Sequence, residues 1–316
     1  MKRAPSAGPL ARRRVDRLRA LRSDAASLHA FAMEVLIDEA NPDIVRLALD
    51  ALGENVQGTD RGVLHEVYQY FDANRGKKDP GGSARTAVLQ ALWHLRSSAD
   101  LDLAIKARST FEPGMQSDGE MIRAAGLALL AVLDPPRAAT EAVIVLGSER
   151  ANPMDGEPAA TAARVLAATG ESNALLLYVL SGAAPTAEVT AAALKGLSGL
   201  DPEVLQRVLD GLSRSEDEAV LMAVCDAVLE LPPGDGPGAI LRRLLDTAPR
   251  GDLYAFIASA IVASRKEAFI DALVESLPGE TSRKRLAAAR EALELAPPTS
   301  VVEAAMKELD ARLKTG

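Results

Sequence analysis

The sequence of 316 residues is poor in several features whose scarcity limits what the protein can be. Only 3% of its residues are aromatic although 48% are hydrophobic. The core must therefore consist of Ala, Leu and Val, which favours closely packed helices over sheets. The single cysteine, Cys225, excludes an intramolecular disulfide framework, and its place in AVCDAV predicts a small buried hydrophobic residue. No apolar run approaches the roughly 20 residues that cross a bilayer, and no signal-peptide core follows the first charges. We therefore expect a cytoplasmic protein.

Catalytic and metal-binding patterns are also scarce. The three histidines, His29, His65 and His94, make no H-E-x-x-H or Cys/His ligand spacing, and we expect each to be a packed or helix-surface residue. The chain has no G-x-x-x-x-G-K-[ST] loop and no G-x-S-x-G elbow. The sequence therefore predicts a protein without catalysis, cofactor or metal site.

Charge is distributed unevenly along the chain. Residues 1–22 carry a net charge of +7, which leaves −15 on the remainder of a chain whose total is −8. An acidic body does not suit a nucleic-acid groove, since duplex binding depends on neutralising phosphates. The N-terminal arm is the exception, and a nucleic acid or another anionic surface could bind through its arginines: Arg12, Arg13, Arg14, Arg17 and Arg19. The alternative is that these arginines form the solvated face of a cap helix starting at Pro9.

One sequence pattern, by contrast, repeats along the chain. Asn41 to Gly53, NPDIVRLALDALG, is a capped, proline-started helix whose apolar residues fall on one face. Its core is a small residue between larger apolar ones, and it recurs every 28 to 40 residues, at about Ala51, Ala91, Ala128, Ala168, Gly196, Ala227, Ala260 and Ala292. A second amphipathic segment separates successive centres. Such a period is typical of stacked helical hairpins, none of which buries its apolar face alone.

The same run resembles the second helix of a HEAT repeat, particularly the short bacterial kind with the pattern D-x-x-V-R-x-x-A-L-x-A-L-G. Arg85 and Arg123 stand at or near the matching arginine position. The resemblance covers about residues 24–316. It implies an all-α fold, a right-handed armadillo-like α-solenoid of about eight HEAT-like helical hairpins with N- and C-terminal cap helices. HEAT folds serve as scaffolds, adaptors, lyases and a few DNA glycosylases, so the resemblance says little about function.

The periodicity divides the chain into a basic arm with a cap helix at 1–22 and one solenoid domain at 23–316. The expected hairpins pair 24–39 with 43–53, 60–73 with 84–96, 99–111 with 119–133, 136–147 with 158–169, 172–182 with 187–199, 202–213 with 217–231, 238–247 with 252–263, and 266–277 with 281–295. A C-terminal cap helix is expected at 300–314.

Three consecutive hairpins carry extended loops between their two helices, at 74–83, 112–119 and 147–158. Such loops emerge on one edge of a stack, and insertions on one face often form a binding surface. These loops supply most of the predicted binding residues: Arg75, Lys77, Lys78, Met115, Arg150, Asn152 and Met154. Their basic and Met content would fit a partner protein whose surface is acidic or mixed apolar. The alternative is tolerated drift, since each doubling of a loop costs only about 0.6 kcal/mol.

Two features of the second helices complete the candidates. Trp93, the only tryptophan, lies off the expected core face and could anchor a peptide or stack a base, although inter-repeat packing favours a core position. The arginine series Arg46, Arg85, Arg123 and Arg164 is expected to be structural, because in HEAT stacks such arginines often pair with an aspartate of the next unit.

The sequence as a whole predicts a non-catalytic protein-binding scaffold or adaptor. Two alternatives remain open: a nucleic-acid-binding HEAT protein of the DNA glycosylase kind, and a lyase-like or maturation factor with HEAT-like repeats. The glycosylase would need a cationic concave surface around a flipped base, which one tryptophan and an acidic body do not favour.

Overall fold

A computed structural model of the chain describes residues 8–73, 77–112, 119–182, 186–248 and 250–315. These ranges contain 18 α-helices and no β-strand, which confirms the predicted all-α class. The chain divides into two compact units, residues 1–169 and 170–316. Helix α1, the cap helix predicted within the basic arm, lies in the first unit. No helix in the described ranges is both long and apolar enough to cross a membrane.

The first unit holds nine of these helices. Their bounds are α1 Pro9–Ala20, α2 Ala25–Asp38, α3 Pro42–Leu52, α4 Arg61–Asp72, α5 Ser83–Leu95, α6 Leu101–Arg108, α7 Glu120–Leu133, α8 Pro135–Ser148 and α9 Ala159–Thr169.

The second unit holds the other nine. Their bounds are α10 Ser172–Leu180, α11 Ala187–Lys195, α12 Pro202–Leu212, α13 Glu218–Glu230, α14 Asp235–Thr247, α15 Gly251–Ala263, α16 Glu267–Ser276, α17 Arg283–Leu293 and α18 Ser300–Thr315. Five short 3-10 helices, η1 Gly53–Asn55, η2 Gly58–Asp60, η3 Ser98–Asp100, η4 Gly196–Gly199 and η5 Leu277–Gly279, begin or extend turns between the α-helices.

Local sequence signals account for where many of these helices begin. Asn41 accepts a hydrogen bond from the backbone N–H of Asp43, and Pro42 occupies the first helical position of α3. Asp134 and Asp201 cap α8 and α12 in the same way, each again followed by proline. A side-chain oxygen at this position satisfies a backbone donor that the helix itself cannot, and proline loses nothing there because its missing N–H would be unpaired anyway. The predicted helix bounds lie close to the observed ones.

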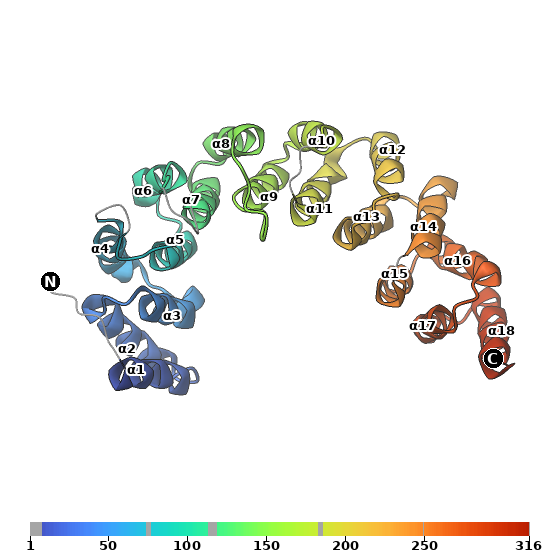
Figure 1. The fold of residues 1–316 in the computed structure, drawn as a ribbon, viewed down its shortest axis with the longest axis horizontal. Helices are drawn as coiled ribbons and strands as arrows, with labels where there is room; N and C mark the ends of the chain where they lie inside the picture. Colours follow the sequence, from blue (N-terminus) through green and yellow to red (C-terminus); the bar gives the residue numbers. More distant parts are fainter. Residues whose placement is uncertain (1–7, 74–76, 113–118, 183–185, 249, 316) are drawn as a thin grey trace. The chain divides into compact units, whose positions relative to one another are not determined.

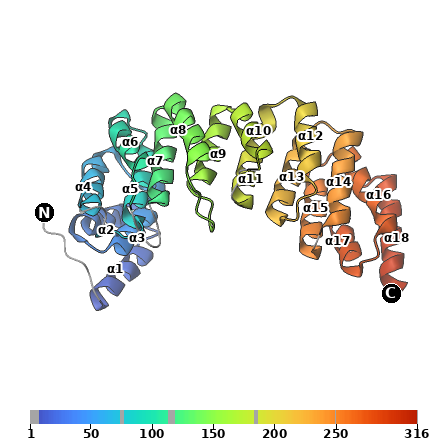
Figure 2. The same cartoon turned by 45° about the horizontal axis from the view of Figure 1, so that its top comes forward.

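Within each unit the second helix of a hairpin packs against the second helix of the next. In the first unit the series is α3, α5, α7 and α9, and in the second it is α11, α13, α15 and α17. Figure 1 shows the first helices α4, α6 and α8 as a separate layer beside α5, α7 and α9. Figure 2 shows the same helices of the first unit from another direction. A layer of second helices presents one face to its own first helices and leaves the other uncovered.

Small side chains make this packing close. Gly126 of α7 lies against α6, where a Cβ atom would meet the backbone nitrogen of Arg108 at 2.5 Å and the Cβ of Ala107 at 2.8 Å. Backbone cannot move aside as a flexible side chain can, so any larger residue there would force α6 and α7 apart. Close packing of α6 and α7 therefore requires a small residue at this position.

Histidine–aspartate hydrogen bonds, which the sequence did not predict, also join successive first helices. His29 on α2 lies 2.8 Å from the carboxylate of Asp60, and His65 on α4 lies 2.6 Å from that of Asp100. Both aspartates are buried, and Arg61 also donates to Asp100 at 2.6 Å. Buried carboxylates require such partners, since an isolated buried charge is costly. His29 and His65 are thus packed structural residues, as expected.

Candidate functional site

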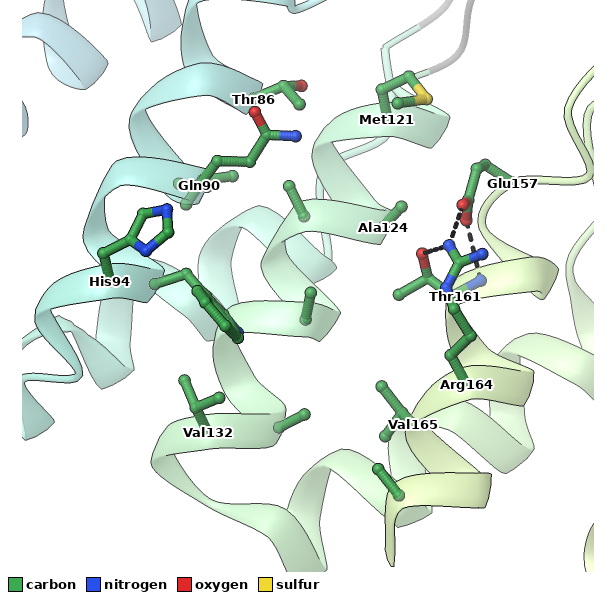
Figure 3. A pocket seen from close by; sticks show the side chains of 16 residues that line it. Thr86, Gln90, His94, Met121, Ala124, Val132, Glu157, Thr161, Arg164 and Val165 are labelled. Atoms are coloured by element: carbon green, nitrogen blue, oxygen red, sulfur yellow. Dashed lines mark hydrogen bonds and ion pairs between the residues drawn. The ribbon is translucent and has the colours of Figure 1, made fainter. Parts of the chain in front are cut away.

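The uncovered face of the second helices in the first unit contains a groove of about 710 Å³, formed by α5, α7 and α9. Figure 3 shows its lining: α7 lies between α5, which carries Thr86, Gln90 and His94, and α9, which carries Thr161, Arg164 and Val165. The groove lies wholly within the first unit.

The hollow exists because the side of α7 that faces it is built of alanine. Ala124, Ala128 and Ala131 line the groove, and their spacing of four and three residues places them on one side of the helix. Methyl side chains leave space where leucines would fill it. Met121 and Val132 close the two ends of this alanine strip.

Trp93 lies on the α5 side of the groove, seven residues after Thr86 and thus about two turns further along the helix. It is half-buried, so the expectation of a core position is not met: part of the indole faces the groove and part packs on the protein. The ring of His94 lies edge-on to the indole at 5.2 Å between centroids, and the Arg96 guanidinium lies 5.3 Å from the indole. These contacts hold an aromatic anchor at the groove wall in a fixed orientation.

The α9 side of the groove is polar. Arg164 donates to Glu157 at 2.5 Å and to the hydroxyl of Thr161 at 2.8 Å (Figure 3). Glu157 also accepts from the backbone N–H of Thr161 at 3.0 Å. Arg164 is therefore paired within its own hairpin, while its side chain stays 58% exposed. The two charges at this wall neutralise each other.

Thr86, on the opposite side, is the least satisfied polar residue of the groove. Its side chain is only 8% exposed, and its hydroxyl has no hydrogen-bond partner within the described part of the chain. An unpaired buried hydroxyl costs about 1–3 kcal/mol, so a native structure rarely keeps one without a reason.

The predicted loop edge is only partly within the described residues. Arg75 and Met115 lie outside them. Lys78 is exposed, but its ammonium lies 3.6 Å from the centre of the Tyr70 ring, a cation–π contact that holds the side chain to the protein. The carboxamide of Asn152 accepts from the N–H of Met154 at 2.8 Å and so shapes its own loop. Three side chains of the predicted set lie on the surface and make no such contact with the part of the chain that the structure describes: Lys77, Arg150 and Met154, the last of them 88% exposed.

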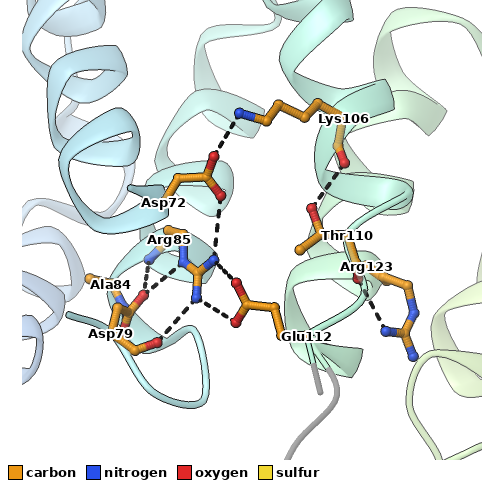
Figure 4. Close-up of polar contacts among 8 residues, drawn as sticks. All are labelled: Asp72, Asp79, Ala84, Arg85, Lys106, Thr110, Glu112 and Arg123. Carbon is orange, nitrogen blue, oxygen red and sulfur yellow. Dashed lines mark hydrogen bonds and ion pairs between the residues drawn. The ribbon is translucent and has the colours of Figure 1, made fainter. Parts of the chain in front are cut away.

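The described parts of the loops do lie side by side, as predicted, and buried arginines join them. Arg85 donates to the carboxylate of Asp79 in the first loop at 3.2 Å and to both oxygens of Glu112 in the second at 2.5 and 2.9 Å (Figure 4). Burial lowers the pKa of the Arg85 guanidinium, but the bonds and charges of Glu112 and Asp79 outweigh it and raise the pKa above its ordinary value.

Arg123 repeats the arrangement one hairpin later. It donates to the backbone carbonyl of Thr110 at 3.2 Å and to Glu149 at 3.0 Å, where the third loop begins. The prediction of structural arginines is thus confirmed for Arg85 and Arg123. The partners in the following hairpin are glutamates that come after its first helix, rather than aspartates: Glu112 lies in the loop beyond α6, and Glu149 directly follows α8. Among the described residues, Arg46 pairs with Asp50 of its own helix alone, at 2.8 Å.

The arginines of the N-terminal arm separate into two groups. Arg14 donates to the buried Glu39 at 2.6 Å, and Arg17 lies 4.3 Å from the centre of the Phe31 ring, so both attach α1 to the helices beside it. Arg12, Arg13 and Arg19 are exposed, and their side chains make no ion pair among the described residues. Only this second group is available to an anionic partner.

The second unit contains a larger groove of about 960 Å³, lined by parts of η4, α12, α13 and α15. Its charged residues include Lys266, whose ammonium donates to the carbonyls of Leu229 and Leu231 at 2.5 and 3.0 Å. That lysine is used within the fold, and the groove has no aromatic anchor. It is a weaker candidate than the groove of the first unit.

No protein-family model and no curated protein matches this chain. The described residues also contain no cluster of three or more His, Cys, Asp or Glu side chains that could hold a metal ion.

The sequence identified Trp93 but missed the groove that it borders. A usable signal was present, because Ala124, Ala128 and Ala131 recur at helical spacing on a helix whose other side is Leu-rich. Alanine is equally common where helices pack closely, however, so the spacing alone does not separate an open face from a covered one.

Proposed function

We propose that the protein is a non-catalytic scaffold or adaptor of the HEAT-repeat type, and that the groove of α5, α7 and α9 receives a segment of a partner protein. The observation that carries the proposal is a half-exposed tryptophan beside an alanine-floored hollow. Tryptophan is enriched among the few residues that contribute most of the binding energy of protein interfaces. A floor of methyl groups lets a partner backbone approach closely.

The repeat count and handedness belong to this proposal too. Eight hairpins in a right-handed solenoid would follow from HEAT-type stacking, in which each hairpin covers the apolar face of its neighbour. We also propose that the protein acts in the cytoplasm.

The loop edge is the second candidate for the same function. Met154 and Arg150 favour it, because both are exposed on the longest described loop of the first unit. An exposed methionine next to cations would suit an acidic partner with some apolar character. The inward pairing of Arg85, Arg123 and Asn152 makes the edge a weaker candidate than the groove.

A recovery experiment with matched variants of the full chain tests the proposal. Ala128→Phe fills the groove, and Ala288→Phe makes the same change at a half-buried alanine of α17, outside it. A third variant carries Arg150→Ser and Met154→Ser. We expect partner proteins identified by mass spectrometry to be lost with Ala128→Phe alone. Recovery unchanged by Ala128→Phe but lost with the loop variant would transfer the function to the edge, and recovery unchanged by all three would contradict the proposal.

A further inference from the structure

We infer that the groove of α5, α7 and α9 is specific for an uncharged peptide segment that carries a large apolar side chain. This inference rests on the proposed function and names the chemical class of partner that this site would take. Three independent features of the lining lead to it: its charge, its apolar wall and its unpaired hydroxyl.

The charge of the groove excludes selection by ion pairing. Of the 16 residues that line it, Glu157 and Arg164 carry full charges at neutral pH, and these two already pair at 2.5 Å. A charged partner would lose its hydration without gaining an unpaired opposite charge, which is unfavourable. The chain elsewhere carries a net charge of −8, so a neutral groove is a local property.

The apolar wall defines what the partner must supply. Trp93, Val132 and Val165 border the alanine floor toward the C-terminal ends of the three helices. A Leu or Phe side chain placed there would bury apolar surface, which stabilises a complex by up to about 1.5–3 kcal/mol when the burial is complete. A short side chain would leave the hollow partly empty and lose those contacts.

The opposite end of the groove supplies hydrogen-bonding groups, which favours a peptide over a purely hydrocarbon ligand. Gln90 is exposed there, and the Thr86 hydroxyl lacks a partner among the described residues. A change of χ1 exchanges the hydroxyl and methyl positions of threonine, and both rotamers occur in helices. The hydroxyl can then face a peptide N–H or C=O group. A peptide backbone thus satisfies one end of the groove while its apolar side chain fills the other.

Selection from a displayed library of random 12-residue peptides tests the composition. The library is first depleted on Ala128→Phe and then selected on the unaltered full chain. We expect the enriched peptides to be uncharged over a segment that contains Leu, Phe, Ile or Met. Enrichment of peptides with clustered acidic or basic residues would overturn the inference.

Fluorescence then tests the place of binding, because Trp93 is the only tryptophan of the chain. An enriched peptide is synthesised without Trp, with blocked ends, and titrated while the Trp93 emission is followed. We expect a shift to shorter wavelength on saturation, since the peptide displaces water from the indole. Gln90→Lys should weaken binding by about tenfold or more, because it replaces an uncharged hydrogen-bonding side chain of the groove with a cation whose hydration the bound peptide would remove. Gln69→Lys makes the same change at an exposed position of α4, outside the groove, and should have no effect.

The outcomes separate the inference from the proposed function. Charged peptides that bind the groove would overturn the inference and leave the scaffold function standing. Uncharged apolar peptides that bind the groove would uphold the inference even if partner recovery is insensitive to Ala128→Phe. Failure to enrich any peptide, or equal binding to Ala128→Phe with circular dichroism showing both proteins folded, would overturn both.

Discussion

Replacing Arg85 with methionine tests whether the buried arginine between the loops holds the first unit together. Arg85 is fully buried, and its guanidinium reaches Asp79, the backbone carbonyl of Asp79, and Glu112. Methionine keeps most of the apolar volume and removes the charge. The change therefore leaves the carboxylates of Asp79 and Glu112 without their cation.

The structure sets the size of the expected effect. Removing one partner of a buried ion pair costs about 3–5 kcal/mol. Asp79 is itself fully buried, but it still accepts from the backbone N–H groups of Ala84 and Arg85 at 3.2 and 3.1 Å. Glu112 is partly exposed and can turn to water. These two compensations place the expected loss at the lower end, about 3 kcal/mol.

Urea denaturation followed by the emission of Trp93 measures this loss, because that tryptophan lies in the first unit and reports its unfolding. With a slope of about 2 kcal/mol per molar urea, a loss of about 3 kcal/mol moves the midpoint by about 1.5 M. Arg46→Met is the matched control. Its exposed pair with Asp50 lies within one helix, and such pairs contribute about 0.3–0.5 kcal/mol.

A loss for Arg85→Met within about 1 kcal/mol of the loss for Arg46→Met would refute the reasoning, since buried and exposed pairs would then be equivalent. Adding Asp79→Asn and Glu112→Gln to the variant gives a further check. Both changes remove the uncompensated charge, so part of the lost stability should return.

Three further predictions concern other parts of the chain. Arg14→Ala should lower the melting temperature, because it removes a cation that donates to the buried Glu39 at 2.6 Å, whereas Arg12→Ala on the exposed face of α1 should leave the melting temperature unchanged in the same thermal scans. Burial raises the pKa of the Glu280 carboxyl, but its hydrogen bonds outweigh this and hold the pKa below its ordinary 4.5. Its stabilising contribution is therefore complete above that pH and declines as the pH falls through the lower folded value, so Glu280→Gln should flatten the acid-unfolding curve. Burial also raises the pKa of the Cys225 thiol to about 12, so a thiol-specific chromogenic disulfide should react at pH 8 only after denaturation, and rapid reaction of the native chain would contradict the burial.

The arrangement of the helices was largely readable from the sequence because the signals are local. The caps at Asn41, Asp134 and Asp201 and the apolar period between them lie within the helices that they specify. The position of Trp93 off the core face of its helix also followed from the sequence, because each residue of an α-helix is rotated by 100° from the one before it. What periodicity could not show was how much of the indole a neighbouring helix would cover.

The groove and the buried charges were decided only by tertiary structure. In the sequence, the alanines of α7 show the same spacing whether another helix covers them or not. It is the placement of α5 and α9 on either side of α7 that leaves a groove over these alanines. Arg46 and Arg85 occupy similar places in the sequence pattern, yet one is exposed and the other fully buried, because only Arg85 has Asp79 and Glu112 near it. Local propensity is a property of neighbouring residues in the chain. Burial and pairing depend on residues tens of positions away, which meet only once the hairpins have stacked.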